Sequence, residues 1–177
     1  MDDILDDIRS GNENDEIKDW KIYLGEEANY YIPKWDKIQS GQIISFNIYA
    51  FIFGIFWMLY RKMYRTALIV GGFIILQLAA EELLMTKMYM TEEEFKPISW
   101  ISTLAINTLL ALFSNWLFYK EAKRKIADVK NTTIGDYDLR LLDVGGTSVL
   151  SIFIGLIIYV VAIALALVII DPTIFNE

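Results

Sequence analysis

Four apolar stretches follow residue 42 and determine most of the predicted architecture. They run over residues 43–60, 66–85, 97–119 and 147–170, and the last holds 24 residues without a charge. A helix of about 20 apolar residues is long enough to cross a hydrocarbon core of about 30 Å. The last three stretches therefore predict three transmembrane helices in an all-α protein.

The first stretch is shorter and more aromatic than the others. Ser45 and Asn47 interrupt its start, so its apolar part covers 13 residues, from Ile48 to Tyr60. As a helix this part reaches only about 20 Å. Aromatic residues recur in it every three to four positions, and such side chains favour the membrane boundary. We expect residues 43–60 to form an interfacial or re-entrant helix, with a fourth transmembrane helix as the alternative.

The distribution of lysine and arginine sets the expected orientation. Of 16 basic residues, five lie in residues 1–42, three in 61–65, two in 86–96 and six in 120–146. Connections rich in basic residues stay in the cytoplasm. Three spans leave 14 basic residues inside and two outside, whereas four spans leave nine and seven. The three-span topology is therefore favoured, with a cytoplasmic N-terminus and 120–146 loop and an outside C-terminus.

Residues 1–42 form the acidic part of the chain. They carry 11 acidic and five basic side chains, which is most of the net charge of −7. Two sets of apolar residues are spaced for one helical face each. These sets are Ile4, Leu5 and Ile8, and Ile17, Trp20 and Leu24. We interpret the segment as a cytoplasmic arm with short amphipathic helices, either docking or solvated, ahead of a membrane domain over residues 43–177.

Depth counting places three polar side chains near mid-membrane. Gln77, Asn107 and Tyr159 each lie 11 or 12 residues from the inner end of their predicted span, or about 16–18 Å. Polar groups in hydrocarbon bond to one another. We expect the three to form a layer between the helices, with Glu81 nearer the outer end. The layer is either a pathway or ligand site, or a packing device.

Composition excludes several kinds of chemistry. The chain has no cysteine and no histidine, which removes disulfides, thiolate and imidazole metal sites and Ser–His catalysis. The net charge of −7 argues against nucleic-acid binding. The Gly145–Ser148 run lacks a Walker-type lysine and predicts a loop-to-helix junction capped by Thr147 or Ser148. We expect no enzyme activity, no catalytic residue, no cofactor and no metal site.

Residues 30–64 carry an ordered set of motifs. They are Tyr30–Tyr31–Ile32–Pro33–Lys34–Trp35, Ser45–Phe46–Asn47, the aromatic run from Ala50 to Trp57, and Tyr60–Arg61–Lys62–Met63–Tyr64. Over residues 29–150 the chain resembles a family of small bacterial inner-membrane proteins catalogued as domain of unknown function 2628. The resemblance implies a bacterial cytoplasmic membrane and helical hairpins, without an established activity. Ile55 stands where many members have proline, which predicts a smoother helix there.

The aromatic and basic cluster that ends the first stretch is the expected functional surface. It comprises Trp57, Tyr60, Arg61, Lys62, Tyr64 and Arg65. Such a cluster suits lipid headgroups or an acidic partner. We expect a non-enzymatic protein that acts through membrane lipids and a protein partner or second copy, as an envelope-complex accessory or an immunity (self-protection) protein. The alternative is a small transporter, channel or lipid-handling protein that uses the polar layer.

Overall fold

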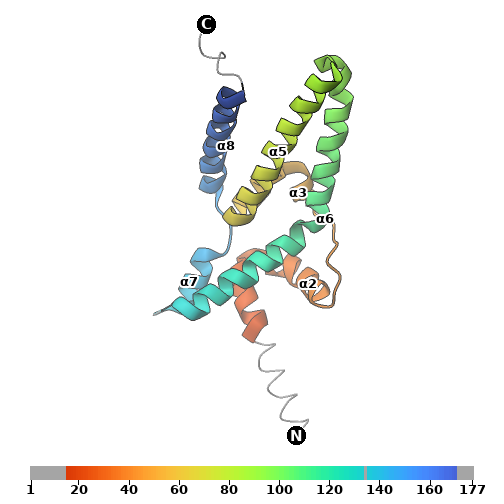
Figure 1. Ribbon diagram of the computed structural model, residues 1–177. Coiled ribbons are helices and arrows are strands. Elements are labelled where there is room, and N and C mark those ends of the chain that lie inside the picture. Colours follow the sequence, from red (N-terminus) through yellow and green to blue (C-terminus); the bar gives the residue numbers. More distant parts are fainter. Residues whose placement is uncertain (1–14, 134, 171–177) are drawn as a thin grey trace. The chain divides into compact units, whose positions relative to one another are not determined.

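The fold is that of a computed structural model, which describes residues 15–133 and 135–170, with side chains up to Leu165. The described elements are all helical, as expected (Figure 1). They are a helix over residues 15–24, η1 (Gly25–Glu27), α2 (Ala28–Gln39), α3 (Ile48–Phe53), α4 (Ile55–Tyr60), α5 (Tyr64–Met88), α6 (Glu92–Thr132), α7 (Tyr137–Val144) and α8 (Val149–Ile170). The predicted face of Ile4, Leu5 and Ile8 lies outside the described residues.

Contacts divide the chain into two compact units. Unit 1 comprises the described parts of residues 1–47 and 112–147, and unit 2 those of residues 48–111 and 148–177. Helix α6 contributes to both units, because the division falls within it. This division differs from the expected boundary after residue 42, since residues 112–147 group with the N-terminal segment.

Aromatic side chains fill the interior of unit 1. Trp35 is 0% exposed, and its ring centre lies 5.4 Å from those of Trp20 and Phe118. Tyr31 meets Phe118 edge-on at 5.0 Å. Aromatic rings in such geometries gain attraction beyond the burial of their surface. The interpretation of residues 15–42 as a solvated tail is therefore wrong, because these residues supply half of a buried core.

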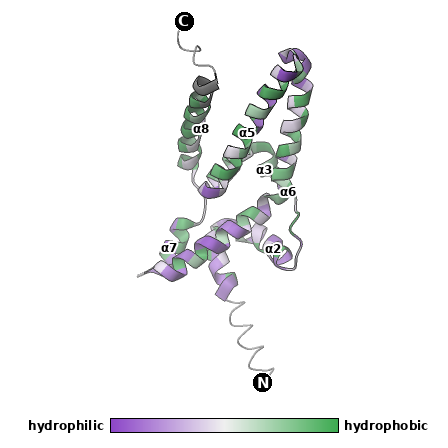
Figure 2. Cartoon of the chain, viewed as in Figure 1, coloured by the Kyte–Doolittle hydropathy of each residue, from purple (hydrophilic) through white to green (hydrophobic). Residues whose placement is uncertain are grey.

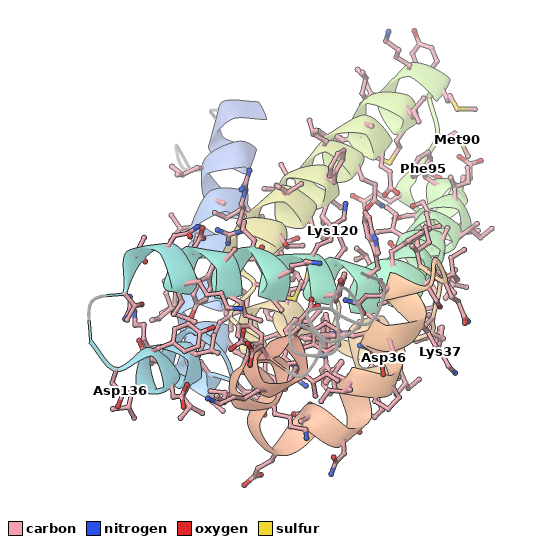
Figure 3. All side chains as sticks on the ribbon, turned by 90° about the horizontal axis from the view of Figure 1, so that it is seen from below. Asp36, Lys37, Met90, Phe95, Lys120 and Asp136 are labelled. Carbon is pink, nitrogen blue, oxygen red and sulfur yellow. The ribbon has the colours of Figure 1, made fainter. Side chains whose placement is uncertain are left out.

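Charged residues of unit 1 lie mostly at its surface, but Asp19 and Glu121 are buried. Asp36 and Lys37 on α2 are exposed and are labelled in Figure 3. Asp19 is buried, forms a 2.6 Å ion pair with Lys130, and accepts a 2.9 Å hydrogen bond from the Tyr137 hydroxyl. Burial, followed by the contact with Asp19, raises the pKa of Tyr137 above its ordinary value. These contacts connect the helix of residues 15–24 with α6 and α7.

Unit 2 has the opposite surface character. Figure 2 shows α5 and α8 as predominantly hydrophobic helices, whereas α2 in unit 1 combines hydrophilic and hydrophobic residues. Large apolar side chains of unit 2 face outward, including Phe73 on α5, Trp100 on α6 and Ile157 on α8. Within the described residues, α5 and α6 are long and apolar enough to cross a membrane. The described part of α8 meets the same criteria of length and hydropathy when α7 is treated with it as one bent span.

The first apolar stretch forms two short helices rather than one. Helix α3 ends at Phe53 and α4 begins at Ile55, on either side of Gly54. Gly54 has φ 51° and ψ −124°, a conformation that side chains other than glycine rarely adopt. The smoother helix expected from Ile55 is therefore wrong: the glycine alone breaks the helix without a proline.

The junction before α8 forms as predicted. The Ser148 hydroxyl accepts a 3.2 Å hydrogen bond from the Ser151 backbone amide, which is the contact of an N-cap. Gly146 donates its amide to the Tyr23 carbonyl at 2.9 Å. A Cβ atom on Gly145 would overlap the Tyr23 backbone. The paired glycines thus allow the chain to pass close to the helix of residues 15–24.

Candidate functional site: a groove in unit 2

Three helices of unit 2 enclose a groove of about 430 Å³. Helix α4 contacts both α5 and α8, so it forms the floor while the longer helices form the walls. The floor is lined by Ile55, Phe56 and Leu59, and the walls by Tyr64, Ala67, Leu68, Gly71, Gly72, Ile75, Ser151, Ile154, Gly155, Ile158, Tyr159 and Ala162. The lining is almost wholly apolar and carries no formal charge, which suits an apolar ligand rather than an ion or a polar metabolite.

Two glycines bring the walls close to the floor. A Cβ atom on Gly71 would lie 3.1 Å from the tip of Ile55, and one on Gly155 would overlap the Leu59 side chain. Small residues permit such close helix approach. The small residues Ala67 and Ser151, four positions before these glycines, line the same groove.

The two hydroxyl groups that line the start of each wall meet each other. The Tyr64 hydroxyl and the Ser151 hydroxyl are 2.6 Å apart and share a hydrogen bond. Tyr64 is the first residue of α5 and Ser151 the third of α8. The groove therefore has a polar end, where both walls begin, and an apolar remainder interrupted by Tyr159.

The predicted functional surface does not form a single exposed patch. Trp57 is buried and Arg61 is only 2% exposed, so the expectation of an exposed Arg61 is wrong. Tyr60 and Lys62 are half-buried. Tyr64 and Arg65, in the first turn of α5, are exposed. The most exposed members of the cluster are thus the two residues in α5.

Burial of Arg61 follows from how α4 ends. The amide of Met63 donates to the Met58 carbonyl at 2.8 Å, and that of Lys62 to the Leu59 carbonyl at 2.9 Å. This is the Schellman pattern, in which one residue adopts a left-handed conformation, here Lys62 with φ 56°. The tight reversal directs Arg61 inward, a turn that aromatic and basic spacing alone does not reveal.

The predicted polar layer is replaced by a cluster between α5 and α6. Gln77 donates to a Glu81 carboxylate oxygen at 2.7 Å and to the Ser102 hydroxyl at 3.1 Å. Ser99 donates to the other Glu81 oxygen at 2.7 Å, and Ser102 also donates to this carboxylate. A carboxylate one helical turn from an amide is a stronger acceptor than a neutral group. Gln77 therefore bonds to Glu81.

The other two members of the expected layer lie elsewhere. The Asn107 side chain lies beside Gly54, 3.7 Å from where a Cβ atom would stand. Tyr159 lines the groove between α4, α5 and α8. The layer of Gln77, Asn107 and Tyr159 does not form, because the three helices bring these residues to three different places.

The sequence patterns do not identify the buried polar residues of unit 1 as a cluster. Asn47 and Asn115 are fully buried and are joined by a 3.0 Å hydrogen bond. Asn115 also donates to the Ser45 hydroxyl at 2.9 Å. Asn115 lies within a predicted span, so its sequence neighbours gave no sign that it belongs to unit 1. The Ser45–Phe46–Asn47 motif was the only available signal.

Comparison with known proteins identifies the chain's family. A search of curated proteins found no match, and neither did a search of solved structures. The family model described as "Protein of unknown function (DUF2628)" matches residues 15–124. The match covers more than half of the chain, from the helix of residues 15–24 into α6, and includes the floor and α5 wall of the groove but not α8. The chain therefore belongs to the DUF2628 family of proteins of unknown function.

Proposed function

We propose that the chain is a non-enzymatic integral protein of the bacterial cytoplasmic membrane, which acts through lipid or protein partners. The observation that carries this proposal is the outward apolar surface of unit 2. Large side chains such as Phe73, Trp100 and Ile157 are exposed along three helices. Soluble proteins rarely expose contiguous apolar surface on this scale, whereas hydrocarbon surrounds it favourably.

The proposed topology has three spans, formed by α5, by the part of α6 that belongs to unit 2, and by α8. The basic residues support it, because 14 of 16 then lie on the cytoplasmic side. Unit 1 would be cytoplasmic, and the 86–96 turn and the C-terminus would be outside. The buried aromatic core of unit 1 supports a role beyond anchoring, since a membrane anchor needs no second folded unit.

Extraction and reporter fusions test this proposal. We expect alkaline carbonate to leave the protein in the membrane pellet and mild detergent to release it. Reporters fused at residues 1 and 177 should report opposite sides of the membrane. Release by carbonate, or both reporters on the same side, would contradict the proposal.

A partner is tested by photo-crosslinking from the exposed start of α5. A photoreactive residue at Arg65 should give a specific adduct with a protein or a lipid, whereas one at Tyr89 should not, although both positions are exposed. Equal adduct formation from both positions would count against a functional surface at the start of α5.

Lipid handling is the second candidate function, and the groove favours it. The groove volume of about 430 Å³ lies within the range of small-molecule sites, about 300–1,000 Å³. Gln77 and Asn107, which we expected to line a pathway, are absent from its lining. A lipid site is therefore better supported than a hydrophilic channel.

A further inference from the structure

We infer that the groove of unit 2 holds one acyl chain of an anionic membrane phospholipid, with the headgroup at the Tyr64–Ser151 end. This inference rests on the proposed membrane placement of unit 2. It assigns to the groove a ligand of stated class, an orientation and a leaflet.

The length of the groove matches one leaflet. Along α5 the lining extends from Tyr64 to Ile75, and along α8 from Ser151 to Ala162. Each interval is 11 residues, or about 16 Å at about 1.5 Å per residue. Half of a hydrocarbon core of about 30 Å is about 15 Å. An acyl chain entering at the polar end would therefore reach mid-membrane where the groove ends.

The cross-section of the groove favours an acyl chain over a helix. Ile55 and Leu59 of the floor lie close against Gly71 and Gly155 of the walls. A flexible hydrocarbon chain can follow the space between these contacts, whereas an α-helix with its side chains is a rigid rod about 10 Å wide.

Charge at the polar end selects an anionic headgroup. Arg65 is exposed and directly follows Tyr64, which lines the groove. In the proposed topology this end lies at the cytoplasmic leaflet, where basic side chains attract anionic lipids at about 1 kcal/mol each. The Tyr64 and Ser151 hydroxyls, 2.6 Å apart, offer hydrogen bonds to the ester or phosphate oxygens. No acidic residue lines the groove.

One glycine offers a way to fill the groove without disturbing the walls. Gly72 lines the groove, and a Cβ atom there would meet nothing within 4 Å. Gly72→Leu therefore puts a bulky side chain into the space proposed for the acyl chain, and it also favours the helix. Ala79→Leu adds a leucine at an exposed position of α5 outside the groove lining and is the matched control.

The test uses the full chain in liposomes that contain phosphatidylglycerol with a photoreactive group in its acyl chain. After illumination, mass spectrometry locates the adducts. We expect adducts on groove residues of α5 and α8, reduced at least fivefold by Gly72→Leu and unchanged by Ala79→Leu. Arg65→Gln should lower the preference for phosphatidylglycerol over phosphatidylcholine about fivefold, while acyl-chain adducts persist.

Several outcomes would overturn the inference. Adducts spread evenly over the outer faces of the helices, or adducts unaffected by Gly72→Leu, would show that the acyl chain does not lie in the groove. Equal labelling by phosphatidylglycerol and phosphatidylcholine, or displacement of the phospholipid by free fatty acid alone, would show that the headgroup is not recognised. A second copy of the chain crosslinked within the groove would show that the groove is a protein interface. The same samples also test membrane placement. Protein that carbonate releases from the liposomes would overturn the proposed function, whereas retained protein without groove adducts would overturn only the lipid site.

Discussion

Units 1 and 2 place the same kinds of side chain in opposite positions. Trp35 of unit 1 is 0% exposed within a cluster of aromatic rings, whereas Trp100 of unit 2 is 70% exposed on a long apolar helix. In water an exposed indole of this kind is unfavourable, and in a bilayer it is not. This contrast is what the proposed placement of unit 2 in a membrane predicts, with α6 shared by both units.

Polar groups follow the same division. Unit 1 buries Asn47 and Asn115 in a contact that leaves neither without a partner. Unit 2 satisfies Glu81 on the side of α5 that meets α6, with donors from both helices. In unit 1 the polar contact fixes a non-helical connection beside α6. In unit 2 the polar contact joins two helices that otherwise present apolar surface.

The tryptophan pair gives the largest expected difference between the units. Trp35→Ala removes the centre of the unit 1 core and should destabilise that unit by about 3–5 kcal/mol. Trp100→Ala removes a side chain that we place in lipid and should change stability by less than about 1 kcal/mol. Limited proteolysis in detergent measures the effect through cleavage within residues 15–47. Equal sensitivity of both variants would contradict the assignment of two solvents.

A glycine pair tests how tightly each unit is packed. Gly145→Ala places a methyl group into the Tyr23 backbone and should destabilise unit 1 by about 1–3 kcal/mol. Gly72→Ala in α5 has open space around it and should be neutral or stabilising by up to about 1 kcal/mol. Thermal unfolding in detergent compares the two. A stable Gly145→Ala variant would show that the close passage past Tyr23 is wrong.

A pair of amides compares polar contacts in the two environments. Asn115→Ala removes the buried hydrogen bond from the Asn47 amide to the Asn115 oxygen, at a cost of about 1–3 kcal/mol. Gln77→Leu loses two hydrogen bonds to the α5–α6 cluster, a change of about 0.6–2 kcal/mol among membrane helices. Chemical denaturation of both variants gives the comparison. A larger loss of unfolding free energy from Gln77→Leu than from Asn115→Ala would contradict this order. It would mean that the α5–α6 cluster stabilises its unit more than the Asn47–Asn115 contact stabilises unit 1.

The smallest expected effect is an alkaline pH dependence of unit 1. The folded pKa of Tyr137 is raised above 10 by burial and then by Asp19. Its contribution to stability is therefore complete below pH 10 and is lost as the pH rises through the folded pKa. The stability difference between wild type and Tyr137→Phe should shrink above pH 10, and comparing the two proteins cancels the titration of shared lysines. A difference that grows above pH 10 would contradict this sign.

The apolar stretches predicted α5, α8 and the unit 2 part of α6 well, because a long apolar helix leaves its signal in consecutive residues. The N-cap at Ser148 was also predictable, since it depends on a local contact with Ser151. Features that depend on distant residues were not. The burial of Trp35 depends on Phe118, which lies 83 positions along the chain, so residues 15–42 resembled a tail.

The candidate site was only partly predictable for the same reason. Tyr64, Arg65 and Tyr159 were identified from aromatic, basic and depth patterns, and Tyr64 and Tyr159 line the groove. The groove itself arises because Gly54 breaks the first stretch and lets α4 pack between α5 and α8. Residue spacing within a continuous helix does not predict such a break. The hydrogen bond from Gln77 to Ser102 likewise depends on the position of α6.

The absence of cysteine from the sequence permits a direct test of the central claim that unit 1 lies in cytoplasm and unit 2 in lipid. Single-cysteine variants Lys18→Cys, Phe73→Cys and Glu93→Cys would be treated with a membrane-impermeant maleimide. We expect labelling of Glu93→Cys in intact cells, of Lys18→Cys only after permeabilisation, and of Phe73→Cys only after denaturation. Labelling of Lys18→Cys in intact cells, or of Phe73→Cys as fast as Lys18→Cys after permeabilisation, would contradict it.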